Sequence, residues 1–117
     1  MISKERLRIR YLRDPLSIRL GELAVTFGCI SFSARNSTDP LVVQNHLHEA
    51  RYFIEWTAAD ADPETAAELV SMQTLVTLWL KAWDKASQYQ EQRTLLSVQA
   101  KHWSDRALDF SGLLMVG

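Results

Sequence analysis

Residues 13–17 of this chain read "RDPLS", and the same aspartate–proline pair returns in "TDPLV" at 38–42 and "ADPET" at 61–65. Proline is favoured at the first position of a helix, where its missing N–H costs nothing, and a preceding aspartate can accept hydrogen bonds from the first-turn amides. The repeated pair therefore predicts three helix starts. The predicted N-caps and first helical residues are Asp14 with Pro15, Asp39 with Pro40, and Asp62 with Pro63.

The segment after Pro63 contains no glycine or proline up to residue 111. One helix of that length would measure about 73 Å at 1.5 Å per residue, whereas a chain of this size has a radius of gyration of about 13 Å when compact. The polar run "SQYQEQR" at 87–93 offers a break, and Ser87 with Gln90 matches a capping box. We predict two helices here; an uninterrupted rod covered by partner chains is the alternative.

These signals predict an all-α fold. Apolar residues recur at helical spacing after each start, which indicates a four-helix bundle-like domain over residues 14–117. Its length and 47% hydrophobic content are typical of one folded domain. The predicted helices cover about 15–35, 40–57, 63–86 and 89–112.

The first 13 residues form a basic arm. Five cations against Glu5 give this arm a charge of +4, while the other 104 residues carry −5. Leu7, Ile9 and Tyr11 alternate with arginines, a period of two that is typical of extended chain. A strand has no partner in a helical chain, so a mobile arm, a strand paired with a second copy and a short helix starting near Ser3 all stay open. The cations are Lys4, Arg6, Arg8, Arg10 and Arg13.

The first predicted helix of the bundle is apolar on two sides. Leu16, Leu20, Leu23, Phe27, Ile30 and Ala34 mark one face. A second series lies almost opposite and includes two glycines seven residues apart. A glycine inside a helix costs about 1 kcal/mol relative to alanine, so the pair indicates close approach by another helix, in the same protomer or in a second copy. This second series is Ile18, Gly21, Val25, Gly28 and Phe32.

The third predicted helix is apolar around most of its girth, and Trp79 and Trp83 lie one turn apart on it. Large aromatic side chains fill cores and also anchor protein interfaces. The chain end "SGLLMVG", residues 111–117, is apolar too, and we expect it to pack on the bundle or on a partner. These features together predict a homodimer whose packing interface includes the glycine series, Trp79 and Trp83.

Chemical sites are poorly supported by the sequence. The four glycines form no phosphate-binding loop, and no histidine has a glutamate three residues before it, as a di-iron bundle requires. His46 and Glu49 share a helix face but His48 points elsewhere, and Cys29 has no sign of activation. We therefore nominate no catalytic residue, cofactor or metal ligand, and rank a metal-dependent or other enzyme last.

The hypothesis at this stage is a non-enzymatic, homodimeric interaction or regulatory module. A nucleic-acid-binding regulator that uses the basic arm is the alternative, because lysine and arginine supply the phosphate contacts of such proteins. The acidic remainder of the chain offers no continuing basic face. The sequence shows no signal peptide, and the apolar stretch around "LVTLWLKAW" is broken by Lys81 and too short to cross a bilayer. We therefore expect a cytoplasmic protein without a membrane span.

Overall fold

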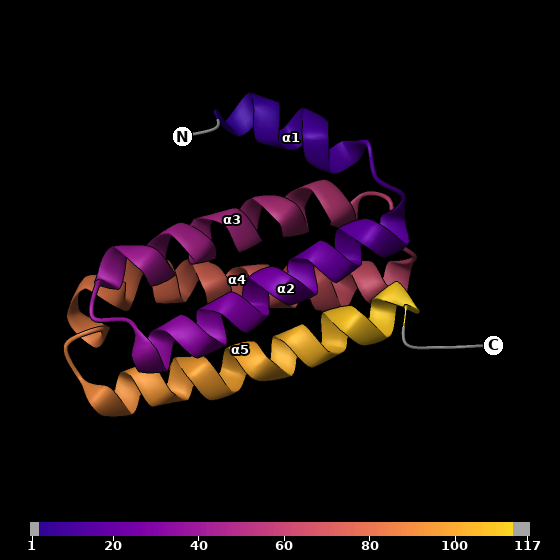
Figure 1. The fold of residues 1–117 in the computed structure, drawn as a ribbon. Helices are drawn as coiled ribbons and strands as arrows, with labels where there is room; N and C mark the ends of the chain where they lie inside the picture. Colours follow the sequence, from indigo (N-terminus) through magenta and orange to yellow (C-terminus); the bar gives the residue numbers. More distant parts are fainter. Residues whose placement is uncertain (1–2, 114–117) are drawn as a thin grey trace.

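The helices α2 to α5 run up and down as a bundle, and α1 packs on its outside against α3 (Figure 1). A computed structural model describes residues 3–113, and this part of the chain contains helices and no strand. The radius of gyration is 13.9 Å. The all-α prediction is confirmed. The helices are α1 (Lys4–Leu12), α2 (Leu16–Asn36), α3 (Pro40–Ala58), α4 (Pro63–Ala86) and α5 (Gln90–Ser111).

Two of the three predicted aspartate caps are confirmed. The Asp39 carboxylate accepts from the Leu41 amide at 3.0 Å, and the Asp62 carboxylate accepts from the Thr65 amide at 3.3 Å. The prediction for Asp14 is wrong: α2 begins at Leu16, and Pro15 itself occupies the capping position without a side-chain hydrogen bond. The reason is the tight turn from α1, in which Asp14 presents its carbonyl to the Arg19 side chain at 3.1 Å.

The break before α5 is confirmed, and the rod is excluded because α4 and α5 are separate helices. The predicted capping box is wrong. Ser87 has helical backbone angles and closes the end of α4, so its hydroxyl turns back to the carbonyl of Asp84. Tyr89 precedes α5 without a side-chain cap, and the Arg93 guanidinium donates to the Ser87 carbonyl at 2.7 Å. An arginine in the first turn therefore stabilises this corner.

The described part of the basic arm is a helix that starts after Ser3, whose hydroxyl accepts from the Arg6 amide. The extended conformation is wrong, because the Tyr11 side chain enters the core and holds this part of the chain there as a helix. Tyr11 is 1% exposed and stacks on Phe53 with ring centroids 4.1 Å apart. Its hydroxyl donates to the Arg19 carbonyl at 2.9 Å and shares a 2.6 Å hydrogen bond with Thr57. Burial raises the pKa of this phenol.

The contact between α2 and α5 is made by small residues on both helices. The Ser104 hydroxyl donates to the Ala24 carbonyl at 2.7 Å, and Ser31 and Ser97 each donate to the other's carbonyl at 2.8 and 2.7 Å. A serine side chain reaches a backbone carbonyl on a neighbouring helix only when the two backbones lie close together. The close approach inferred from the glycines is therefore found within the protomer. The small residues are Gly21, Ala24, Gly28 and Ser31 on α2, and Ser97, Ala100, Ser104 and Ala107 on α5.

Tyr11→Phe tests the docking of α1. The change removes the hydroxyl and leaves the fully buried Thr57 without that partner, so we expect the free energy of unfolding to fall by about 1–3 kcal/mol. Urea denaturation followed by tryptophan fluorescence measures it. Tyr89→Phe is the control, since Tyr89 is 57% exposed. Equal stability of both variants would show that the Tyr11 hydroxyl contributes nothing to the docking of α1.

Replacing two glycines by alanine should have opposite effects. A Cβ at Gly28 would lie 3.8 Å from the Ser104 hydroxyl, an ordinary contact, so Gly28→Ala should stabilise the protein by about 0.5–1 kcal/mol through helix propensity. Gly112 ends α5 with φ at +71°, where alanine is strained by about 1–2 kcal/mol. Thermal unfolding measures both variants. A destabilising Gly28→Ala would mean that α5 packs more tightly on α2 than described.

Candidate interaction surface

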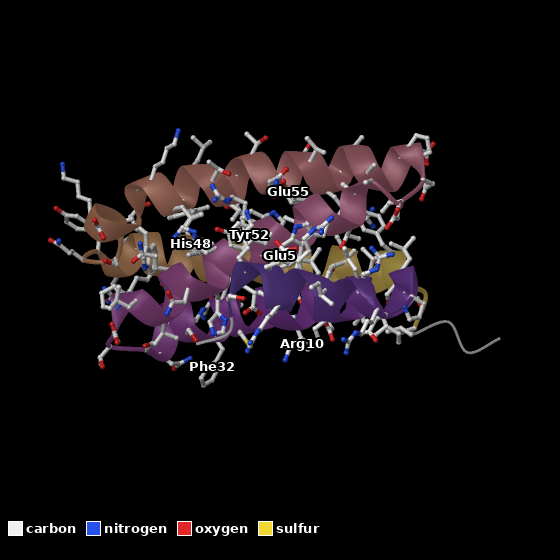
Figure 2. All side chains as sticks on the ribbon, turned by 90° about the horizontal axis from the view of Figure 1, so that it is seen from above. Glu5, Arg10, Phe32, His48, Tyr52 and Glu55 are labelled. Carbon is white, nitrogen blue, oxygen red and sulfur yellow. The ribbon has the colours of Figure 1, made fainter. Side chains whose placement is uncertain are left out.

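The outward side of α2 carries an apolar surface that no described part of the chain covers. Ile18, Val25 and Phe32 are 39%, 66% and 69% exposed, and we call these three residues the outer strip. Residues on the opposite side of the same helix, such as Leu23 and Phe27, are fully buried. From the α1 side of the molecule, Phe32 projects away from the bundle (Figure 2). The protomer thus buries one of the two apolar faces of α2.

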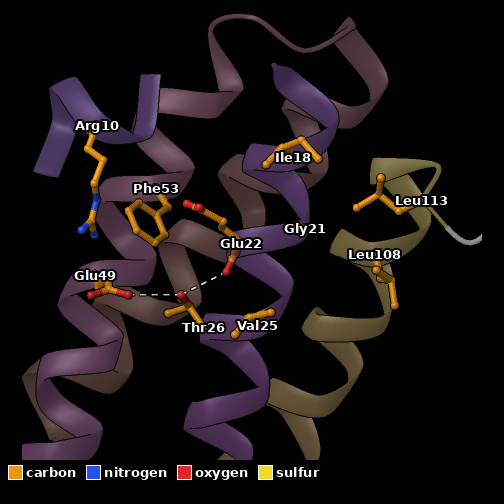
Figure 3. Close-up of a pocket in the computed structure, with 10 residues that line it drawn as sticks. All are labelled: Arg10, Ile18, Gly21, Glu22, Val25, Thr26, Glu49, Phe53, Leu108 and Leu113. Carbon is orange, nitrogen blue, oxygen red and sulfur yellow. Dashed lines mark hydrogen bonds between the residues drawn. The ribbon is translucent and has the colours of Figure 1, made fainter. Parts of the chain in front are cut away.

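A hollow of about 550 Å³ lies beside the N-terminal half of the outer strip (Figure 3). Gly21 forms part of its wall, and Leu113 lies so close that a Cβ on Gly21 would be 2.9 Å from the leucine methyl carbon. We call this space the Gly21 hollow. Leu108 and Leu113 line it from the α5 side, and Arg10, Phe53 and Glu49 line it from α1 and α3. Of the apolar tail, residues 114–117 lie outside the described range, and Leu113 packs on the bundle as expected.

Two glutamates give this end of the surface an acidic character. The Thr26 hydroxyl donates to the Glu22 carbonyl at 3.1 Å and to the Glu49 carboxylate at 3.3 Å, which ties α2 to α3. Burial raises the pKa of the Glu22 carboxyl, and the Asp14 carboxylate adds to this effect, while Arg10 opposes it. Ionisation of Glu22 is therefore less favourable in the folded protomer than in the unfolded chain.

The opposite end of the outer strip has basic side chains. A second hollow of about 430 Å³ lies there between α2 and α5, with Phe32 on its edge. Arg35 and Lys101 line it, and no carboxylate does. The Arg35 side chain donates to the Ser97 hydroxyl at 2.7 Å, while Lys101 pairs with Asp105 at 2.6 Å. The outer strip thus runs from an acidic end to a basic end.

The sequence did not predict a second apolar surface, between α4 and α5. These two helices pack loosely, and a groove of about 570 Å³ lies between them, with Leu75, Leu95 and Val98 among its walls. Arg106 crosses the groove to Glu68 with two hydrogen bonds of 2.7 and 2.9 Å, which lower the pKa of the Glu68 carboxyl. Leu95 and Val98 follow the helical period of α5 and therefore look like core positions in the sequence.

The other predicted interface residues lie inside the protomer. Trp83 is 2% exposed and its indole donates to the Pro40 carbonyl at 3.0 Å, so it joins α4 to the start of α3. Trp79 is partly buried and donates to the Gln99 side chain at 2.6 Å, so it joins α4 to α5. Gly28 lies beside Ser104 of α5 but is only partly buried and also lines the second hollow. Of the predicted series, the three large side chains of α2 remain available to another molecule.

The cations of α1 meet carboxylates and aromatic rings of the same chain. Lys4 lies 4.5 Å from the centre of the Tyr52 ring, and Arg8 is 3.9 Å from Glu5. Arg10 lies on the Gly21 hollow with Glu22 and Glu49 (Figure 3). Arg6 and Arg13 are exposed. Of these cations, Arg10 is the one that these contacts place beside carboxylates from outside the arm.

Two further features bear on function. Among residues 3–113, no group of three or more histidine, cysteine, aspartate or glutamate side chains is placed to hold a metal ion. In the same range, α2 is long and apolar enough to cross a membrane, with a mean hydropathy of 1.3 over its most apolar window. Such composition is weak evidence of a span because a helix with two apolar faces also has it, and 39% of that window is buried in the bundle.

Comparisons with protein-family models, with curated proteins and with solved structures find no match to this chain. The function is therefore inferred from the outer side of α2, which carries an apolar strip, two hollows beside it and charges of opposite sign at its ends.

Glu22→Gln tests the electrostatics of the acidic end. Because the pKa of Glu22 is raised in the folded protein, the folded state holds a proton that the unfolded state has lost, and stability falls as the pH rises through that interval. The glutamine variant should therefore be more stable than the parent at pH 7, and this gain should vanish below the ordinary glutamate pKa of about 4.3. Urea denaturation at both pH values, with the exposed Glu55→Gln as control, measures it. The same gain in both variants would contradict the prediction.

Proposed function

We propose that this protein is a non-enzymatic interaction module that acts as a homodimer, and that the outer strip of α2 is its contact surface. The observation that carries the proposal is the exposure of Ile18, Val25 and Phe32 on one face of a helix, seven residues apart. A spacing of seven residues keeps side chains on one side of a helix and is the repeat of helix–helix seams. Exposed apolar patches of this kind mark interaction sites.

The small residues of the protomer support this use of α2. Gly28 borders the outer strip on the α5 side and leaves the surface low beside Phe32, whereas Leu113 occupies the space beside Gly21. A second helix can therefore approach α2 closely, and Phe32 can insert as an anchor. Aromatic anchors that enter a hollow dominate the binding energy of many interfaces.

The α4–α5 groove supports a contact surface less well. Its two walls are already linked by the Glu68–Arg106 ion pair and by the hydrogen bond between Trp79 and Gln99. A helix that entered this groove would have to displace these satisfied polar contacts. The outer strip has no such bridge across it in the described part of the chain.

The expected affinity is modest. From Ile18 to Phe32 the strip covers fifteen residues, and its ends lie about 21 Å apart at a rise of 1.5 Å per residue. With α2 alone as the contact, the interface is at the small end of the range for specific complexes, which bury about 800 Å² per partner. We expect a dissociation constant in the micromolar range and a dimer at tens of micromolar.

Val25→Lys tests the proposal by light scattering at tens of micromolar. It places a charge in the middle of the outer strip, and we expect a monomer with a circular dichroism spectrum like that of the parent. Val70→Lys is the matched control, because Val70 is 49% exposed on α4, away from the strip. It should dimerise normally. A monomeric parent, or a Val25→Lys variant that dimerises like the control, would overturn the proposal.

A further inference from the structure

We infer that two copies pair antiparallel along α2, about a two-fold axis at Val25, with Phe32 of each copy seated in the Gly21 hollow of the other. This inference rests on the proposed dimer and specifies its geometry. It commits to a second copy of this chain as the molecule that covers the outer strip.

The positions of the outer strip have the symmetry that such a pair requires. In a two-fold interface, a contact from residue i to residue j is matched by one from j to i. Ile18 and Phe32 lie seven residues to either side of Val25. In an antiparallel pair centred on Val25, that residue faces its own copy and Ile18 faces Phe32 of the second copy. The outer strip then covers itself along its whole length.

The shapes of the two ends also match. Phe32 is 69% exposed, so it is available as a projecting group. Ile18 and Gly21 line the hollow of about 550 Å³ that this phenyl ring would meet, with Leu108 and Leu113 behind them. In the same register, Glu22 of one copy faces Gly28 of the other, where the absence of a side chain leaves room for the carboxylate. A bulky residue at position 28 would remove that room.

Charge favours the antiparallel direction over the parallel one. Glu22 and Glu49 line the hollow at one end of the strip, together with Arg10. Arg35 and Lys101 line the hollow at the other end, where Lys101 already pairs with Asp105 at 2.6 Å, so the net positive charge there comes from Arg35. Antiparallel pairing brings the acidic end of each copy to the basic end of the other, whereas parallel pairing opposes like charges, which is destabilising. Arg35 makes no ion pair among the described residues.

Disulfide cross-linking of single-cysteine variants tests the geometry. In a Cys29→Ser background, Val25→Cys, Ile18→Cys and Phe32→Cys are each exposed to a glutathione redox buffer and examined on non-reducing gels. A disulfide needs Cα atoms about 4.4–6.8 Å apart, whereas equivalent residues at position 18 would be about 21 Å apart in the antiparallel pair. We expect Val25→Cys to cross-link with itself. Ile18→Cys and Phe32→Cys should cross-link only when mixed.

A substitution without cysteine gives a second measurement. Phe32→Ala should raise the dissociation constant at least tenfold, because each copy loses the phenyl ring that sits in the Gly21 hollow of the other copy. Leu78→Ala, at a position 55% exposed on α4, should leave it unchanged.

The outcomes separate this geometry from the dimer itself. Self-cross-linking of all three single variants would show a parallel pair and overturn the antiparallel inference. A dimer in light scattering without any of these cross-links would place the contact on another face and overturn it as well. A monomeric parent would remove both the dimer and its geometry, and a monomer whose α2 binds lipid vesicles would identify lipid as the occupant of the outer strip.

Discussion

Ser31 and Ser97 exchange hydrogen bonds with each other's backbone carbonyl, and Ser104 binds the carbonyl of Ala24 in the same way. These contacts require α2 and α5 to lie close together, since the spacing of packed helices, about 8–10 Å between axes, depends on the size of the side chains at the contact. The rest of the bundle depends on this approach. Glycine, alanine and serine occupy the contact because any larger side chain would hold the two backbones apart.

The outer strip lies on the side of α2 opposite its buried face. Gly28 lies beside Ser104 of α5, and Gly21 lies beside Leu113, which follows α5. The helix is therefore buried on one side and apolar on the other, which also gives it a composition that suits a membrane span. The hollow beside the strip is lined by residues of α1, α2 and α3 and by Leu108 and Leu113.

Polar contacts join the helices where apolar packing between them is sparse. Tyr11 carries α1 onto the bundle through Phe53 and Thr57. Arg19 is 7% exposed and donates to the Trp56 carbonyl and to Asp60, so it ties the start of α2 to the end of α3. The Glu68–Arg106 pair spans the loose α4–α5 contact, where partial exposure limits its contribution to stability. These interactions hold the outer parts of the fold in place, whereas the α2–α5 contact sets the spacing of the helices.

The sequence by itself determined where most helices begin and end, because proline, aspartate capping and polar interruptions act within one turn of chain. It also showed that α2 has two apolar faces. Only the tertiary structure decided which face is buried, that α5 is the helix packed against the glycines, and that the alternating arm is helical around Tyr11. Those outcomes depend on contacts such as Tyr11 with Thr57 and Ser31 with Ser97, between residues far apart in the chain. Local periodicity carries no information about which partner a face will meet.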